Sequence, residues 1–271
     1  MSHFHVITGA GEKLDMPVIH KISIADLFDA LRLGIADFWD KPSHYVMLTI
    51  IYPIVGIVLA VWASGFHTWS LLYPLMGGFA LIGPFAAIGL YEISRRREQG
   101  LDTSWSHAFE VLRSPAIGSI AAVGVMLLVV FTLWLTAAQA LYENIFGSDT
   151  PQEFTALLDQ IFNQPGGMTL LVVGSMMGAV FALFTLCTTV VAFPLLLDRD
   201  VGAFVAVETS FRAVLKNPVP MIAWGIIVGL SVFIGSIPVF VGLALVLPIL
   251  GHSTWHLYRK VVEPVSAIRG L

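Results

Sequence analysis

The stretch AIGSIAAVGVMLLVVFTLWLTAAQA, residues 116–140, decides the fold class, because it contains no charged side chain. A membrane hydrocarbon core about 30 Å thick needs roughly 20 apolar residues of helix to cross it. Five other stretches meet that requirement or nearly do, at about 44–63, 69–91, 168–193, 219–236 and 239–258. The sequence therefore predicts an all-α integral membrane protein with six transmembrane helices.

The composition of the chain agrees with this class. Of 271 residues, 57% are hydrophobic and 12% are charged, whereas a soluble domain carries about 25% charged residues. The net charge of −4 gives no basic field for a nucleic-acid partner. The single cysteine, Cys187, excludes an intrachain disulfide and a cysteine-ligated metal site.

The positions of the basic residues predict the orientation of the chain. All 14 Lys and Arg residues fall on one side of the six-span arrangement, whereas the opposite loop at 141–167 carries only acidic charges. The positive-inside rule then places both termini in the cytoplasm and this acidic loop outside. The first 22 residues lack the apolar core of a signal peptide, so we expect a flexible cytoplasmic tail at 1–22, a membrane domain at 23–262 and a tail at 263–271.

Three cytoplasmic segments share one pattern, which indicates an internal repeat. Residues 23–42, 103–115 and 201–218 each read as an amphipathic helix that ends at a proline, namely Pro42, Pro115 and Pro218. Because proline disfavours helix at the residue before it, the chain should turn there and enter the membrane. We expect three transmembrane hairpins, each preceded by a cytoplasmic amphipathic helix. The alternative is that any cytoplasmic loop tends to be basic and amphipathic.

Helical spacing predicts an apolar face on each segment, which would be buried in the lipid headgroup zone or against the helix bundle. The predicted apolar faces are Ile24, Leu27, Phe28, Leu31, Ile35 and Phe38 in the first segment, Trp105, Ala108, Phe109 and Leu112 in the second, and Phe204, Val207, Phe211, Val214 and Leu215 in the third. Asp26, Asp29 and Asp37 fall on the opposite face of the first segment. Ser23 with Asp26 resembles a capping pair, and Asp200 is expected to cap the third segment.

Small residues and prolines inside the spans predict local packing. Gly174 with Gly178 and Gly225 with Gly229 form GxxxG strings, whose usual role is close helix packing. Pro84, Pro194 and Pro248 are expected to interrupt their helices. Thr185, Thr188 and Thr189 form a mild polar patch with Cys187, which hydrogen bonds from the hydroxyls to helical carbonyls would explain.

Charged residues gather at the predicted cytoplasmic mouth of the second and fourth spans. Glu92 precedes Arg95 and Arg96, and a pair between Glu92 and Arg96 at i,i+4 is expected. The second group is Asp198, Arg199 and Asp200. Both groups are explained by helix ends, and the functional alternative is that these six residues line a polar vestibule.

The sequence contains few residues that could form a catalytic or metal-binding site. His252 and His256 share a helical face at i,i+4, but no neighbouring carboxylate or cysteine completes a ligand set, so they are weak metal or haem candidates. No hydrolase, metalloprotease, Walker A or dinucleotide-binding motif occurs. We therefore expect no enzyme activity, no cofactor and no resident metal.

Two strings carry a resemblance to a known family. GPFAAIGLYEISRRREQG (83–100) and FPLLLDRDVGAFVAVETSFRAVLKNP (193–218) are similar to domain-of-unknown-function family 2189, over about residues 20–262. The resemblance implies a six-span inner-membrane protein of bacteria with no established activity.

Three functions follow as hypotheses. The first is a non-enzymatic accessory, assembly or lipid-organising factor, whose partners are membrane lipids or another membrane protein or complex. The alternative is a transporter or channel for an apolar or weakly polar small solute, which would use the proline-broken second, fourth and sixth spans. The third is an accessory subunit beside a respiratory complex.

Overall fold

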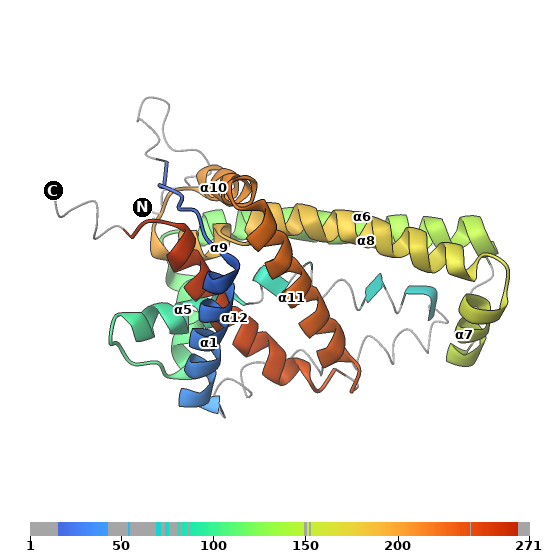
Figure 1. The fold of residues 1–271 in the computed structure, drawn as a ribbon, viewed down its shortest axis with the longest axis horizontal. Coiled ribbons are helices and arrows are strands. Elements are labelled where there is room, and N and C mark those ends of the chain that lie inside the picture. The colour runs from blue at the N-terminus through green and yellow to red at the C-terminus, as the bar shows by residue number, and fades with distance from the viewer. Residues whose placement is uncertain are drawn as a thin grey trace.

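The architecture is helical in the part of the chain that the structure describes. A computed structural model describes residues 16–42, 54, 69–71, 74–75, 81, 83–85, 87–148, 151, 153–238 and 240–264. Its helices are α1 (Ile24–Asp40), η1 (Trp69–Leu71), α5 (Ile88–Glu98), η2 (Trp105–Arg113), α6 (Ile117–Phe146), α7 (Phe154–Asn163), α8 (Gly167–Thr189), α9 (Ala192–Asp198), α10 (Ala203–Lys216), α11 (Pro218–Ser236) and α12 (Leu243–Val261) (Figure 1). Within these ranges the one β contact is an isolated bridge between Ile19 and Val262.

Three helical segments of the described chain are long and apolar enough to cross a membrane. They are Ile117–Phe146, Gly167–Asp198 and Pro218–Ser236, and they correspond to the spans predicted at 116–140, 168–193 and 219–236. The span predicted at 44–63 lies outside the described residues apart from Ile54, and so does much of the span at 69–91. By length and composition, these helices agree with the predicted class of an integral membrane protein.

The predicted sixth span forms a helix that is more polar than the three candidate membrane-spanning segments. α12 begins at Leu243 and continues to Val261, whereas the prediction placed it at 239–258. Its second half carries His252, His256, Arg259 and Lys260, so it is less apolar than the three candidate spans. Of these four residues His252 is buried, while His256, Arg259 and Lys260 are partly exposed. α12 buries twelve of its residues against its neighbours, more than any other helix among those described.

The predicted acidic loop is partly helical. α6 extends beyond the predicted span to Phe146, and α7 follows before α8 begins at Gly167. α6 and α8 lie side by side as two long rods, and α7 packs against α8 (Figure 1). α7 lies at one end of this pair, far from α1, α5, α9 and α10 (Figure 1). We call the opposite end, formed by α1, α5, η2, α9, α10 and the last turns of α12, the polar end.

The three predicted turns occur where the prolines place them. α1 ends at Asp40 before Pro42, and η2 ends at Arg113 before Pro115. α10 ends at Lys216 and α11 begins at Pro218. Proline suits the first helical position because its missing N–H has no partner there in any case. The second segment is a 3₁₀ helix rather than the expected α-helix, and the chain after Pro42 lies outside the described residues.

The predicted apolar faces of α1, η2 and α10 are divided between the interior and the surface. Four predicted residues are buried, namely Leu27 and Phe38 in α1, Ala108 in η2 and Val214 in α10, together with the small residues Ala30, Gly34, Ala206 and Ala213. The large apolar residues Phe28, Ile35, Trp39, Trp105, Phe109, Leu112, Phe204, Phe211 and Leu215 are exposed. Small residues allow close approach of neighbouring backbones, so packing, not hydrophobicity alone, decides which face turns inward.

The contact between α1 and α12 shows how close this packing is. A Cβ placed on Gly34 would overlap the side chain of Ser253 and lie 2.8 Å from its Cα. Asp26 accepts hydrogen bonds from the backbone N–H (2.8 Å) and hydroxyl (2.7 Å) of Ser23, which confirms the predicted capping pair. By contrast, Asp200 does not cap α10, because Gly202 occupies the N-cap position.

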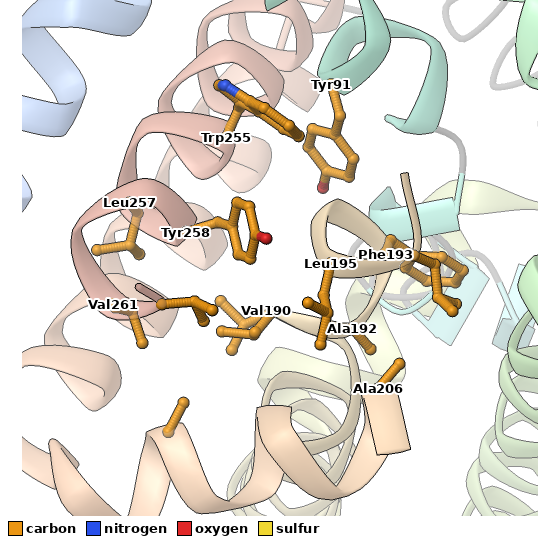
Figure 2. Packing of buried hydrophobic residues seen from close by; sticks show 14 of the residues in the cluster. Tyr91, Val190, Ala192, Phe193, Leu195, Ala206, Trp255, Leu257, Tyr258 and Val261 are labelled. Atoms are coloured by element: carbon orange, nitrogen blue, oxygen red, sulfur yellow. The ribbon is translucent and has the colours of Figure 1, made fainter. Parts of the chain in front are cut away.

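The core is centred on the break between α8 and α9. The α8 helix ends at Thr189, and α9 resumes at Ala192 with Pro194 in its first turn. The proline ring would clash with the carbonyl four residues earlier, so a continuous helix is disfavoured at this point. Phe193 and Leu195 of α9 are fully buried, and Figure 2 shows Leu195 on the side of α9 that faces Tyr258 of α12.

The first and last described residues are tied together at the polar end. The N–H of His20 donates to the carbonyl of Val261 (2.7 Å), and the N–H of Glu263 donates to the carbonyl of Val18 (3.0 Å). Asn217 accepts a hydrogen bond from the N–H of Ile22 (2.8 Å) and donates one to the carbonyl of His20 (3.0 Å). Residues 18–22 of the predicted tail are therefore attached to the membrane domain, and residues 1–15 lie outside the described chain.

Candidate functional site

The predicted vestibule residues meet at the polar end, but in separate pairs. Glu92 pairs with Arg95 through two hydrogen bonds of 2.8 Å, at i,i+3. The predicted pair of Glu92 with Arg96 is wrong, because Arg96 turns to Glu110 (2.8 Å) and to the carbonyl of Asp102 (2.7 Å). The i,i+3 geometry lets the guanidinium of Arg95 contact both carboxylate oxygens of the buried Glu92.

The second predicted group joins α9 to α12. Asp198 accepts a hydrogen bond from the hydroxyl of Tyr258 (2.6 Å) and lies 3.5 Å from the guanidinium groups of Arg199 and Arg259. Asp200 is exposed. Asp198 and Arg199 therefore fasten the end of α9 to α12, which is the structural role that the sequence also allowed.

A cleft lies beside the first group. It has a volume of about 370 Å³, and its charged lining residues are Glu92, Arg95, Glu110 and Arg113. Two carboxylates oppose two guanidinium groups in this set, so the lining has no net charge. The cleft is the nearest structural counterpart to the predicted vestibule, but Asp198, Arg199 and Asp200 do not line it.

A buried polar network between α1, α5 and α12 was not predicted from the sequence. Asp37, assigned from the sequence to the polar face of α1, is 6% exposed. Its carboxylate accepts hydrogen bonds from Ser94 (3.0 Å) and His256 (2.8 Å) and pairs with Arg97 (3.2 Å). Burial raises the pKa of Asp37, but the bond from His256 and the neighbouring positive charges outweigh it and leave the pKa below its usual value.

The two weak metal candidates belong to this network. His256 bonds to Asp37, and Nδ1 of His252 lies 2.7 Å from the hydroxyl of Ser94. No group of three or more His, Cys, Asp and Glu side chains that could hold a metal ion occurs among the described residues. The two rings thus connect α12 to α1 and α5. In the sequence, the only indication of this network was that Asp37, Ser94 and His256 are polar residues in or next to three predicted helices. Their proximity depends on how these helices pack.

A second recess is an apolar cavity between α8 and α11, bordered on a third side by α12. It has a volume of about 450 Å³, within the range typical of small-molecule sites. Its walls include Leu186 of α8, Trp224 and Val228 of α11 and Leu250 of α12. None of the described residues that line it is charged. Such a cavity suits an apolar ligand.

Small residues and broken helices make room for this cavity. Gly225 and Gly229, the predicted GxxxG string of α11, both line it. A Cβ on Gly225 would lie 3.1 Å from Leu186, whereas one on Gly229 would meet no atom within 4 Å. Gly178 of the other string instead approaches Trp134 on α6, at 3.2 Å for an added Cβ. The string with Gly178 therefore packs α8 against α6. The string with Gly225 and Gly229 packs α11 against α8 and also borders the open space of the cavity.

The mouth of the cavity lies on the outer surface of the spanning helices. Leu183 of α8 and Ile222 and Ile226 of α11 line the cavity, and each is about half exposed, at 47%, 48% and 56%. The neighbouring outer faces of α8 and α11 carry further exposed apolar side chains. These half-exposed side chains place an opening of the cavity on the outer surface of α8 and α11.

The polar groups of the cavity gather at one end. Tyr91, Thr185, Thr189 and Thr254 line the part nearest the polar end, because α8 and α12 both run toward it. Thr189 and Thr254 donate to the carbonyls of Thr185 and Leu250, each at 2.7 Å. The expected back-bonding is thus present at Thr188 and Thr189. Thr185 differs, since its buried hydroxyl has no hydrogen-bond partner among the described residues.

The fold and the apolar cavity define the class of an integral membrane protein of helical type. Comparison with known families gives one match within the chain: residues 72–198 match the family described as predicted integral membrane protein (DUF2189), which confirms the resemblance predicted from the sequence over that part of the chain. No curated protein matches the chain, and no solved structure does so either.

Proposed function

We propose that the protein is a non-enzymatic, six-span protein of the bacterial inner membrane that holds a membrane lipid, as a lipid-organising or accessory factor. The observation that carries this proposal is the apolar cavity between α8 and α11 with its mouth on the lipid-facing surface. Apolar lining with few polar groups is typical of sites for hydrophobic ligands. A lipid chain reaches such a site from the bilayer without crossing water.

Three features support the proposed topology, with both termini in the cytoplasm. All basic residues fall on one side of the six-span arrangement. α7, with its acidic flanks, lies at the end of the α6 and α8 pair opposite to α1, α5 and α10 (Figure 1). The first and last described residues pair at the polar end, as an even number of crossings requires.

The exposed apolar faces of α1, η2 and α10 support a place for these helices at the membrane interface. Trp39, Trp105 and Phe204 are among the large side chains they expose. Aromatic residues are enriched where hydrocarbon meets headgroups, and helices of this kind lie along the surface with their apolar face in the lipid. This arrangement would encircle the proposed cytoplasmic end with lipid-embedded side chains.

The test is lipid retention by variants of one helix. After purification in mild detergent, lipid extraction and mass spectrometry should find a lipid bound to the wild-type chain. Gly229→Phe should lose it, because the ring would fill the cavity where a Cβ meets nothing. Ile234→Phe places the same ring on an exposed position of α11 outside the cavity and should keep it. Equal retention by all three proteins would contradict the proposal.

A transporter for an apolar or weakly polar solute is the second candidate, because the cavity touches the three proline-broken segments. Its lining includes Pro84, Thr189 just before the α8 break, and Leu247 next to Pro248. Proteoliposomes containing the protein should then show solute flux that Gly229→Phe blocks. Absence of flux across a broad panel of apolar solutes would remove this candidate, while retained lipid would still support the first.

A further inference from the structure

The distribution of polar groups in the cavity specifies the chemistry of its ligand, and this inference rests on the proposed function. No described lining residue carries a charge, so the cavity has no group to neutralise a phosphate or carboxylate. An ionised headgroup placed there would lose its hydration without compensation. The occupant is therefore uncharged within the cavity.

The hydroxyl of Thr185 adds a requirement for a hydrogen-bond acceptor. Thr185 is 4% exposed, lines the cavity, and its hydroxyl has no hydrogen-bond partner among the described residues. The neighbouring hydroxyls of Thr188, Thr189 and Thr254 all donate to carbonyls of their own helices. A buried hydroxyl without a partner is costly and rare in folded proteins.

The cavity is also divided along its length. Thr185, Thr189 and Thr254 lie toward the polar end, because α8 and α12 run toward it. Ala179 and Leu247 come earlier on these two helices, and Val232 lies near the far end of α11, which runs away from the polar end. We propose that the cavity binds an uncharged amphiphile whose carbonyl or hydroxyl oxygen accepts a hydrogen bond from Thr185 and whose hydrocarbon chain runs toward Val232. A fatty ester, a long-chain alcohol and a quinone with an isoprenoid tail share this chemistry, whereas an anionic phospholipid headgroup does not.

The first part of the test compares three probes on the full wild-type chain in nanodiscs. Labelled methyl decanoate, decane and decanoate are titrated at a pH where decanoate is ionised, with empty nanodiscs as background. We expect methyl decanoate to bind about fivefold more tightly than decane, the effect of one net hydrogen bond. Equal affinity for these two, or tightest binding of decanoate, would overturn the inference.

The second part assigns the preference to one hydroxyl. Thr185→Val should lower the affinity for methyl decanoate to that for decane and leave decane unchanged, and Thr185→Ser should retain the preference. Thr188→Val is the matched control, because Thr188 lies on the same helix and does not line the cavity. A loss of ester preference in Thr188→Val, or an equal loss for both probes in Thr185→Val, would refute the role of Thr185.

The two proposals fail in different ways. If a native lipid is retained and Gly229→Phe removes it, but methyl decanoate and decane bind equally, only the inference about ligand chemistry is wrong. If the wild-type chain binds no probe and retains no lipid, the proposed function is wrong as well.

Discussion

The carboxylate of Asp37 connects three helices at the polar end. It belongs to α1, it contacts Ser94 and Arg97 of α5, and it accepts a hydrogen bond from His256 of α12. Asp29, one face away on the same helix, makes a similar contact with Lys260 of α12 (2.8 Å) but is exposed. The two residues therefore allow the same chemical change to be compared in buried and exposed surroundings.

Asp37→Asn should lower the free energy of unfolding by about 2 kcal/mol or more, because Arg97 would lose its countercharge and the buried contacts with Ser94 and His256 would be weakened. Asp29→Asn should change it little, since exposed ion pairs contribute weakly. Thermal unfolding in detergent, followed by circular dichroism, measures both. Equal unfolding temperatures for the two variants would show that the Asp37 network does not stabilise the fold.

His107 gives the structure a dependence on pH. Its ring lies 2.6 Å from Glu110 and 2.9 Å from Asp102, and these hydrogen bonds raise the pKa of His107 above its ordinary value of 6.5. Stability from this group is therefore fully present below pH 6.5 and is lost as the pH rises through the raised value.

The prediction for His107 is a difference in unfolding temperature that varies with pH. Wild type should exceed His107→Gln in unfolding temperature at mildly acidic pH, and this advantage should shrink as the pH rises above neutrality. Comparing the two proteins at each pH removes the contribution of the other histidines. An advantage that stays constant across this range would contradict the role of the protonated ring.

At the scale of elements, the contact between α1 and α12 depends on the absence of a side chain. Gly34→Ala should destabilise the protein by about 1–3 kcal/mol, because a methyl group would overlap Ser253, including its backbone. Gly229→Ala is the control, since an added Cβ there meets no atom within 4 Å and alanine favours helix. Denaturant unfolding of both variants tests this, and equal loss of stability would argue against a tight helix contact.

The turn between α10 and α11 offers a second prediction. Pro218→Ala should let α10 continue beyond Lys216 and lower the yield of folded protein, because the proline restricts the preceding residue to non-helical conformations. Pro264→Ala, after the last helix, should matter little. Size-exclusion profiles of the two variants give the measurement. Identical yields would mean that Asn217, which bonds to residues 20 and 22, is sufficient for the turn.

Hydropathy and proline positions predicted α6, α8, α11 and the turns well, because each of these features depends only on the residues of one helix or one turn. The apolar faces were predicted in part. Leu27 and Val214 are buried in the protein, whereas Phe28 and Phe204 are exposed on its surface, and Asp37, expected on the polar face, is buried. In a membrane protein large apolar side chains are stable on the outside, so hydrophobicity alone does not indicate the core. The cavity could not be predicted, because it depends on the relative packing of three helices, α8, α11 and α12.

At the scale of the molecule, the proposed orientation can be measured by cysteine labelling. In a Cys187→Ser background, Asp159→Cys lies on α7 and Arg212→Cys on α10, and both positions are exposed. A membrane-impermeant maleimide should label Asp159→Cys in intact cells, and Arg212→Cys only after permeabilisation. Labelling of Arg212→Cys in intact cells would overturn the topology and the repeat scheme with it.

The hydrogen bond between Val18 and Glu263 places the two ends of the described chain next to each other. A short peptide could bridge these two residues without moving a helix, and the covalent chain could then be opened elsewhere. Such a circularly permuted protein should fold to the same arrangement of helices. The order in which hairpins enter the bilayer could thus be separated from the structure that they finally form.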